Sequence, residues 1–206
     1  MQPYKKDGVN QIYELLFCDD LELYRGMNTA PDVYPWNILF DGNADNDQLR
    51  EILHDPALET RPKILAARVL EENGVVEPVR CVMGVVVEAG LPDGLDVVAA
   101  YEDGTARYIN FSEKIIIWDT PTEESEALIT ELFNAGVAVV NNIGPWEGPR
   151  KPAPASGTIR LNFLVSDGLY FGEEPFEVLQ TDPMGGPVIA VAVKLMSYLI
   201  REAGES

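Results

Sequence analysis

The sequence predicts an α+β fold, in which an antiparallel sheet of about six strands is covered by helices and preceded by an N-terminal helical segment. Three observations predict it. Apolar residues recur at helical spacing through the first eighty residues, the spacing becomes strand-like from Val79, and the strand-like runs are joined by hairpin turns. The expected order is helices, four strands, a helix, two strands and a final helix.

The chain is expected to form a single domain, residues 1–206, with a mainly helical subdomain over 1–78 and the sheet-containing core over 79–206. Residues 11–17 predict a short helix that Asp19 and Asp20 end. The aromatic stretch that follows has irregular spacing, and we expect it to lie over the core as a lid.

Residues 45–74 predict two antiparallel helices. Asp55-Pro56 breaks the apolar spacing, Thr60 can cap the second helix and Gly74 can end it. The pattern resembles one unit of a HEAT repeat, and the matching residues are Leu49, Leu53, Asp55, Pro56, Arg61, Ala66 and Ala67. A second copy is missing and a solenoid needs about three units, so the segment is interpreted as a helical hairpin.

Four short β-branched or aromatic runs between residues 81 and 119 predict an antiparallel meander. Asp103-Gly104 is the strongest turn signal, because a two-residue hairpin turn requires positive φ and glycine adopts it at little cost. Side-chain alternation along these runs is imperfect. We therefore expect one face of the sheet to be covered and the other to be partly exposed to water.

Thr120 to Glu123 form a capping-box sequence that predicts the start of a helix, and the helical spacing continues to about residue 143. Residues 137–140 fit either this helix or a strand. Two further strands flank Ser166-Asp167-Gly168, and an apolar helix is expected over 187–201. These two late helices are expected to cover one sheet face.

Composition excludes several classes of function. The chain has 34 acidic and 15 basic residues, a formal net charge of −19, which repels nucleic acid and anionic lipid and attracts cationic protein surfaces. The N-terminus has no apolar run typical of a secretion signal. The longest apolar segment is interrupted by Lys194 and is expected to be too short to cross a bilayer. Cys18 and Cys81 have no metal or redox spacing, so we expect them to be reduced and the protein to be cytoplasmic. The leading hypothesis below takes it as a bacterial-type protein.

The sequence predicts no catalytic residue, no metal site and no cofactor. His54 is the only histidine, and phosphate-binding glycine motifs are absent. Residues 41–47 alternate oxygen-bearing side chains, but the glycine and glutamate of a calcium loop are out of register. The sequence therefore favours a non-enzymatic role.

The strongest candidate for a contact surface is the loop over residues 141–157, NNIGPWEGPRKPAPASG. Its prolines fix φ and make it stiff, which lowers the entropy lost on binding. Aromatic and arginine side chains are enriched in binding hot spots. The candidate contact residues, from this loop, the following hairpin and the central strands, are Trp146, Arg150, Lys151, Tyr170, Phe171 and Arg107. The loop also fits a plain crossover in which Trp146 plugs the core.

Three functions remain open. The leading hypothesis is a protein-interaction module, inhibitor-, immunity- or adaptor-like, whose partner is a basic protein. The first alternative is a ligand-binding domain or enzyme for a small anion or carboxylate, with its site at the sheet end near 145–154 and 166–172. The second alternative is a structural assembly subunit.

Overall fold

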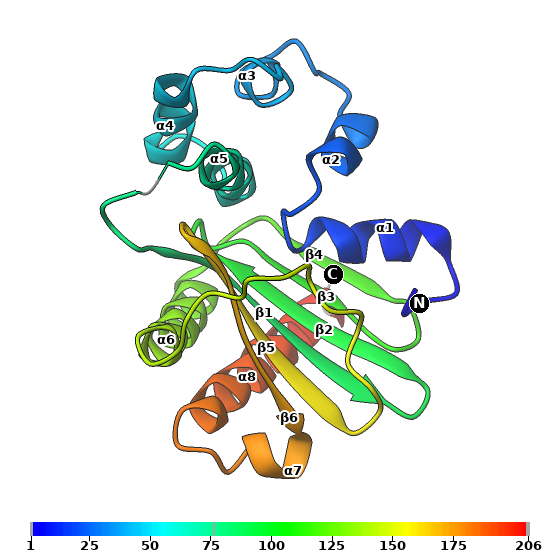
Figure 1. Ribbon diagram of the computed structural model, residues 1–206. Helices are drawn as coiled ribbons and strands as arrows, with labels where there is room; N and C mark the ends of the chain where they lie inside the picture. Colours follow the sequence, from blue (N-terminus) through cyan, green and yellow to red (C-terminus); the bar gives the residue numbers. More distant parts are fainter. Residues whose placement is uncertain (1, 76, 205–206) are drawn as a thin grey trace.

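In the computed structural model, which describes residues 2–75 and 77–204, six strands form one antiparallel sheet in the order β4-β3-β2-β1-β5-β6 (Figure 1). The α+β class, the meander and the later hairpin are confirmed. The strands are β1 (Val82–Leu91), β2 (Gly94–Tyr101), β3 (Ala106–Ile109), β4 (Ile115–Trp118), β5 (Thr158–Val165) and β6 (Gly168–Pro175).

Strand β1 lies inside the sheet, with β2 on one side and β5 on the other. Val87 of β1 is opposite Val98 of β2 and Leu161 of β5, so these three side chains share one face. The neighbouring residues point to the other face. Because apolar residues occupy most positions on both faces of β1, each face needs a cover.

One face is covered, as expected, by α6 (Glu123–Val140) and α8 (Gly185–Gly204) (Figure 1). The short α7 (Phe176–Leu179), which the sequence did not predict, lies beside them. Residues 137–140 are helical. The glycine before them, Gly136, lets α6 approach closely, because an added Cβ would lie 3.1 Å from the Phe163 ring. Below, this is called the α6/α8 face.

The helix α6 begins differently from the sequence prediction. Thr122 is its N-cap, and the capping box joins Thr122 to Ser125 rather than Thr120 to Glu123. The Ser125 amide donates to Thr122 Oγ1 at 3.2 Å, and the Thr122 amide donates to Ser125 Oγ at 2.8 Å. The observed capping box has a serine at the third helical position, whereas the sequence motif used for the prediction requires glutamate or glutamine there.

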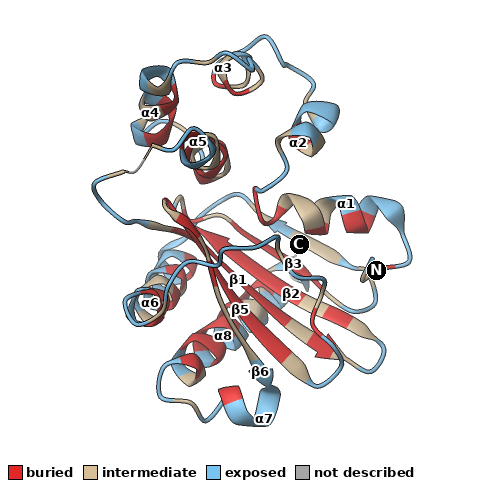
Figure 2. Cartoon of the chain, in the orientation of Figure 1, coloured by how far each residue is buried: buried red, intermediate tan, exposed pale blue. Residues whose placement is uncertain are grey.

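The other face, called the α1 face, carries the N-terminal helices, and buried residues of both form one apolar cluster (Figure 2). The expected partial exposure of this face is wrong, because Tyr13 and Phe17 of the α1 region cover it. The helices are α1 (Asp7–Leu15), α2 (Leu21–Met27), α3 (Trp36–Leu39), α4 (Asn46–His54) and α5 (Thr60–Glu72). The helical hairpin is present as α4 and α5, while the sequence did not predict α2.

The connection from β2 to β3 is longer than predicted. It contains four residues between Tyr101 and Ala106, so a two-residue hairpin turn is wrong. Thr60 is the first residue of α5 rather than its cap, and its hydroxyl accepts from the Asp103 amide at 3.0 Å while Asp103 Oδ2 accepts from the Thr60 amide at 2.7 Å. The turn is thereby attached to α5. Gly104 has a φ of +82°.

Replacing Gly104 with valine is expected to lower the free energy of unfolding by about 1–3 kcal/mol, because a β-branched residue is strained at positive φ. A Cβ there would also lie 3.0 Å from Pro121. Denaturant unfolding measures the loss. Gly8→Ala is the control, since a Cβ at Gly8 meets nothing within 4 Å. An unchanged unfolding midpoint for the Gly104 variant would contradict this account of the turn.

Candidate functional site

A cluster of polar side chains is buried on the α1 face, in the middle of the sheet. Glu88 on β1 lies directly opposite Arg160 on β5, and Asn162 follows two residues later on the same face of β5. All three side chains are almost completely buried. Charged groups in such a place must find partners, since an unpaired buried charge costs several kcal/mol.

The partners come from α1 and from β6. Tyr13 of α1 donates its hydroxyl hydrogen to Glu88 Oε1 at 2.6 Å, and Asn162 Nδ2 donates to Glu88 Oε2 at 2.9 Å. Arg160 is 3.5 Å from Glu88 Oε2 and makes its shorter contacts, 2.5 Å, with Glu173. Helix α1 is therefore held to the sheet by polar contacts as well as by apolar packing.

Burial raises the pKa of Glu88, and its contacts with Tyr13, Arg160 and Asn162 lower the pKa by less than burial raises it. Burial is also the main reason that the pKa of Tyr13 is raised, and the Glu88 charge adds to the effect. Within the described part of the chain, Asn162 Oδ1 accepts no hydrogen bond. The cluster is thus incompletely satisfied at one acceptor.

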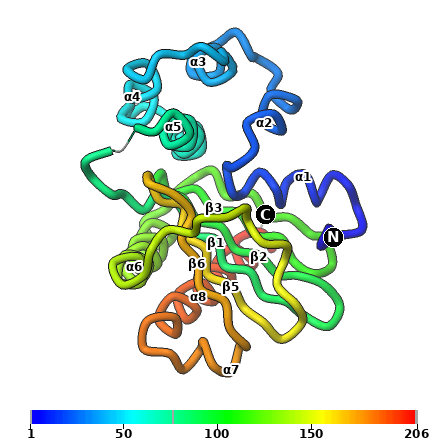
Figure 3. The backbone as a smooth tube through the Cα atoms, in the orientation of Figure 1, coloured from blue at the N-terminus to red at the C-terminus, as the bar shows by residue number. Residues whose placement is uncertain are grey.

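The proline-rich segment over residues 145–154, called the strap, crosses the sheet between α6 and β5 (Figure 3). Arg150 forms ion pairs with Glu14 and Asp19, and its Nε donates to Asp19 Oδ2 at 2.7 Å. Its guanidinium also lies 3.9 Å from the centre of the Phe17 ring. The strap is attached at its other end, where the Trp146 amide donates to the Leu169 carbonyl at 2.7 Å.

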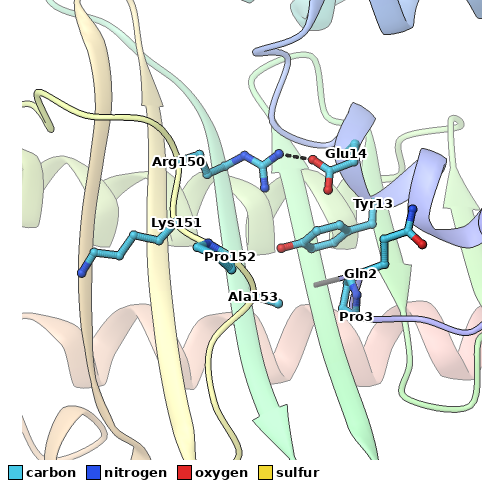
Figure 4. A pocket seen from close by; sticks show the side chains of 8 residues that line it. All are labelled: Gln2, Pro3, Tyr13, Glu14, Arg150, Lys151, Pro152 and Ala153. Carbon is cyan, nitrogen blue, oxygen red and sulfur yellow. Dashed lines mark hydrogen bonds and ion pairs between the residues drawn. The ribbon is translucent and has the colours of Figure 1, made fainter.

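A cleft of about 270 Å³ lies between the strap and α1 (Figure 4). Tyr13 and Glu14 line it on one side, and Arg150, Lys151 and Pro152 on the other. The Tyr13 hydroxyl already donates to Glu88, and the Arg150 guanidinium is already neutralised. The Tyr13 hydroxyl and the Arg150 guanidinium are therefore both engaged in contacts within the fold.

Three of the six predicted contact residues lie together at the outer side of the strap. The rings of Trp146 and Phe171 are 5.1 Å apart, and Lys151 Nζ lies 5.4 Å and 5.0 Å from their centres. Trp146 is 42% exposed, so it does not plug the core. Together they form a small cationic and aromatic surface.

The other three residues do not join this surface. Tyr170 is buried on the α6/α8 face, because alternation along β6 directs it away from Phe171. Arg107 is buried on β3, which β2, β1 and β5 separate from β6, and it pairs with Asp119 at 2.6 Å. Arg150 lies in the strap but is only 15% exposed. Of the three basic residues predicted as contacts, Lys151 is therefore the one that lies at this surface.

The sequence analysis did not predict the buried polar cluster. The sequence indicates the cluster by a charged residue within an otherwise apolar strand, Glu88 in VVVEAG. It also has Arg160 and Asn162 at alternate positions of TIRLNFLV. Charged side chains are rarely buried unless they are paired, so such positions mark a polar network. Tyr13 carried no comparable signal.

Comparison of the chain with known proteins identifies no family. The sequence matches no protein-family model and no curated protein. Across residues 2–75 and 77–204, no group of three or more histidine, cysteine or carboxylate side chains is arranged to hold a metal ion. In the same residues, no helix combines the length and apolar character required to cross a bilayer.

Arg150 and Lys151 are adjacent, but their substitution by alanine is expected to have different effects. Arg150→Ala should lower the free energy of unfolding by about 1–3 kcal/mol, because it leaves Glu14 and Asp19 without their cation. Lys151→Ala should change it by less than about 0.5 kcal/mol, because Lys151 is exposed. Urea unfolding distinguishes the two. Equal, small effects would show that the strap is not held by Arg150.

Replacing Glu88 with glutamine is expected to change how stability depends on pH. A carboxyl whose pKa is raised by folding binds its proton more tightly when folded, so stability is lost as pH rises from about 4.5 through the raised pKa. Glu88→Gln removes this loss. The stability of the variant relative to the parent should therefore rise between about pH 4 and pH 8.

The measurement is urea unfolding of both proteins over this pH range. Glu174→Gln is the control, because Glu174 is exposed on β6 and its substitution should give a difference that varies little with pH. A constant difference for the Glu88 variant would mean that Glu88 is ionised equally easily in the folded and unfolded chains.

Proposed function

We propose that the protein is a non-enzymatic interaction module whose partner is a basic protein. One observation carries the proposal: each of the nine arginines forms an ion pair with a carboxylate of the same chain. The positive charge is thus largely used internally, and the excess of carboxylates is left for the surface. A surface of one sign attracts and orients partners of the opposite sign.

The N-terminal helical segment carries a large share of this excess. Residues 19–59 contain ten carboxylates and two arginines, a net charge of −8 without His54. Arg25 pairs with Glu22, and Arg50 pairs with Asp47 and Glu77. In Figure 1 the connection from α2 to α3 and the helix α4 lie at the end of the molecule away from α7 and α8.

An exposed apolar pair lies within this acidic region. Val33 is 58% exposed and Tyr34 is 42% exposed. The Tyr34 hydroxyl donates to Asp55 Oδ2 at 2.9 Å. Desolvation, this hydrogen bond and the charges of Asp55 and Glu51 raise the pKa of Tyr34 to about 12. The acidic docking surface is the name used below for Asp32, Val33, Tyr34, Glu51 and Asp55.

The composition of this surface suits a basic partner. A tyrosine supplies a large contact area with few rotatable bonds, and tyrosine is enriched in hot spots. The surrounding carboxylates would accelerate encounter with lysine and arginine side chains and fix their orientation. Small-anion binding has weaker support, because Arg150 and Arg107 are already neutralised and Lys151 is the cation that remains near the predicted site.

The test uses the protein immobilised on a resin and exposed to a lysate, followed by rate measurements with each recovered partner. The proposal requires partners with a high isoelectric point. Association should slow steeply between low and physiological salt, as the Debye length falls from about 30 Å at 0.01 M to about 8 Å at 0.15 M. Salt-independent association would contradict it.

Variants separate the surface from net charge alone. Asp32→Asn with Glu51→Gln should reduce the association rate several-fold, and Tyr34→Ala should mainly increase dissociation. The matched control is Glu72→Gln with Glu174→Gln, which changes the net charge equally at exposed positions elsewhere. An equal loss in both double variants would show that recognition does not use the acidic docking surface.

A further inference from the structure

A cavity of about 140 Å³ lies on the α6/α8 face, between the sheet and the first half of α8. Val87 and Ala89 of β1 and Ile159 of β5 form part of its floor. Ala89 lies directly opposite Ile159 on the adjacent antiparallel strand, which places both at the same end of the sheet. The cavity is on the opposite face from the strap and its cleft.

The cavity exists because small residues occupy two lining positions. Ala192 lines it from α8, and Ala89 lines it from β1, so neither element fills the space between them. Val193 and Phe176, half-exposed residues of α8 and α7, lie at its rim. The lining is apolar at nine of its ten residues.

The tenth lining residue is Asp96 of β2, which lies directly opposite Ala89. Its two oxygens are fixed by separate donors: the Tyr108 hydroxyl donates to Oδ2 at 3.0 Å and the Phe111 amide donates to Oδ1 at 2.7 Å. Both donors are neutral. None of the ion pairs found within residues 2–75 and 77–204 involves Asp96.

We propose that this cavity is a binding site for a small organic ammonium ion, whose apolar part fills the cavity and whose charged nitrogen contacts Asp96. The volume is close to the roughly 150 Å³ that an engineered apolar cavity needs to hold benzene, which sets the apolar part at about one aromatic ring. A half-buried carboxylate with no cation beside it favours a charge-assisted hydrogen bond from an ammonium group.

The same features select against other ligand classes. A carboxylate on an apolar ring would be repelled by Asp96, and a neutral ring would gain only the apolar contacts. Phe176 at the rim offers an aromatic ring, a type of group that attracts organic cations. The site is independent of the proposed protein interaction, because it lies on the α6/α8 face and away from α2 to α4.

The experiment compares three probes of similar shape by titration, followed through methyl NMR signals: 2-phenylethylamine, 2-phenylethanol and 3-phenylpropionate. The amine is expected to bind about tenfold more tightly than the alcohol, which corresponds to one charge-assisted hydrogen bond, and the carboxylate more weakly than either. Equal affinities for amine and alcohol would overturn the proposal.

Two substitutions locate the binding. Asp96→Asn should remove the preference for the amine and leave the affinity for the alcohol nearly unchanged; a retained preference would mean that net charge alone attracts the amine. Val193→Trp should block all three probes, because Val193 is 48% exposed at the rim and tolerates a larger side chain. Ala190→Trp, at an exposed position of the same helix, is the matched control and should bind as the parent does.

Thermal unfolding of each variant separates loss of binding from loss of folding. If Asp96→Asn fails to fold, the Val193→Trp and Ala190→Trp pair still decides the location. Amine binding by Val193→Trp at the parent's affinity would place the ligand elsewhere and overturn the proposal.

Discussion

The rest of the structure depends on the burial of β1 on both of its faces. A strand whose side chains are apolar in both directions cannot lie at a surface, so two layers of helix must cover it. The chain supplies α6 and α8 for one face and α1 to α5 for the other. The N-terminal helices therefore share their apolar cluster with the sheet.

The buried polar cluster follows from the same constraint. Glu88 belongs to β1, so it is carried into the interior together with the apolar residues around it. Its partners are drawn from two other parts of the chain: Tyr13 from α1, and Arg160 and Asn162 from β5. Arg160 in turn donates to the Lys151 carbonyl at 3.2 Å, which connects the strap to the sheet. Polar contacts thus link α1, the strap and the central strands into one unit.

Local patterns in the sequence were sufficient for the sheet. The meander and the hairpin are made of strands adjacent in the chain, so turn residues and alternation predict them. The docking of α1 and the strap could not be predicted in this way. Arg150 meets Glu14 and Asp19, which lie more than 130 residues earlier, and no local pattern encodes such a pairing.

Local sequence patterns were also insufficient to predict which residues of the candidate site lie together. Tyr170 and Phe171 are neighbours in the chain, yet alternation along β6 places them on opposite faces. Trp146 and Phe171 were predicted together because each lies close to the β5–β6 hairpin. The sequence could not predict which basic residues remain free to bind a ligand, because this depends on the carboxylates that the fold brings close to them.

The position of β1 between β2 and β5 also has a consequence for the order of folding. The partner on one side, β2, follows after a two-residue connection, whereas β5 begins only after the whole meander and α6. Closing the longer loop costs more chain entropy, so the β1–β2 pairing is expected to form first. Until β5 arrives, β1 is an edge strand with free backbone hydrogen-bonding groups and an apolar surface. During synthesis this edge is therefore open to pairing with a wrong strand.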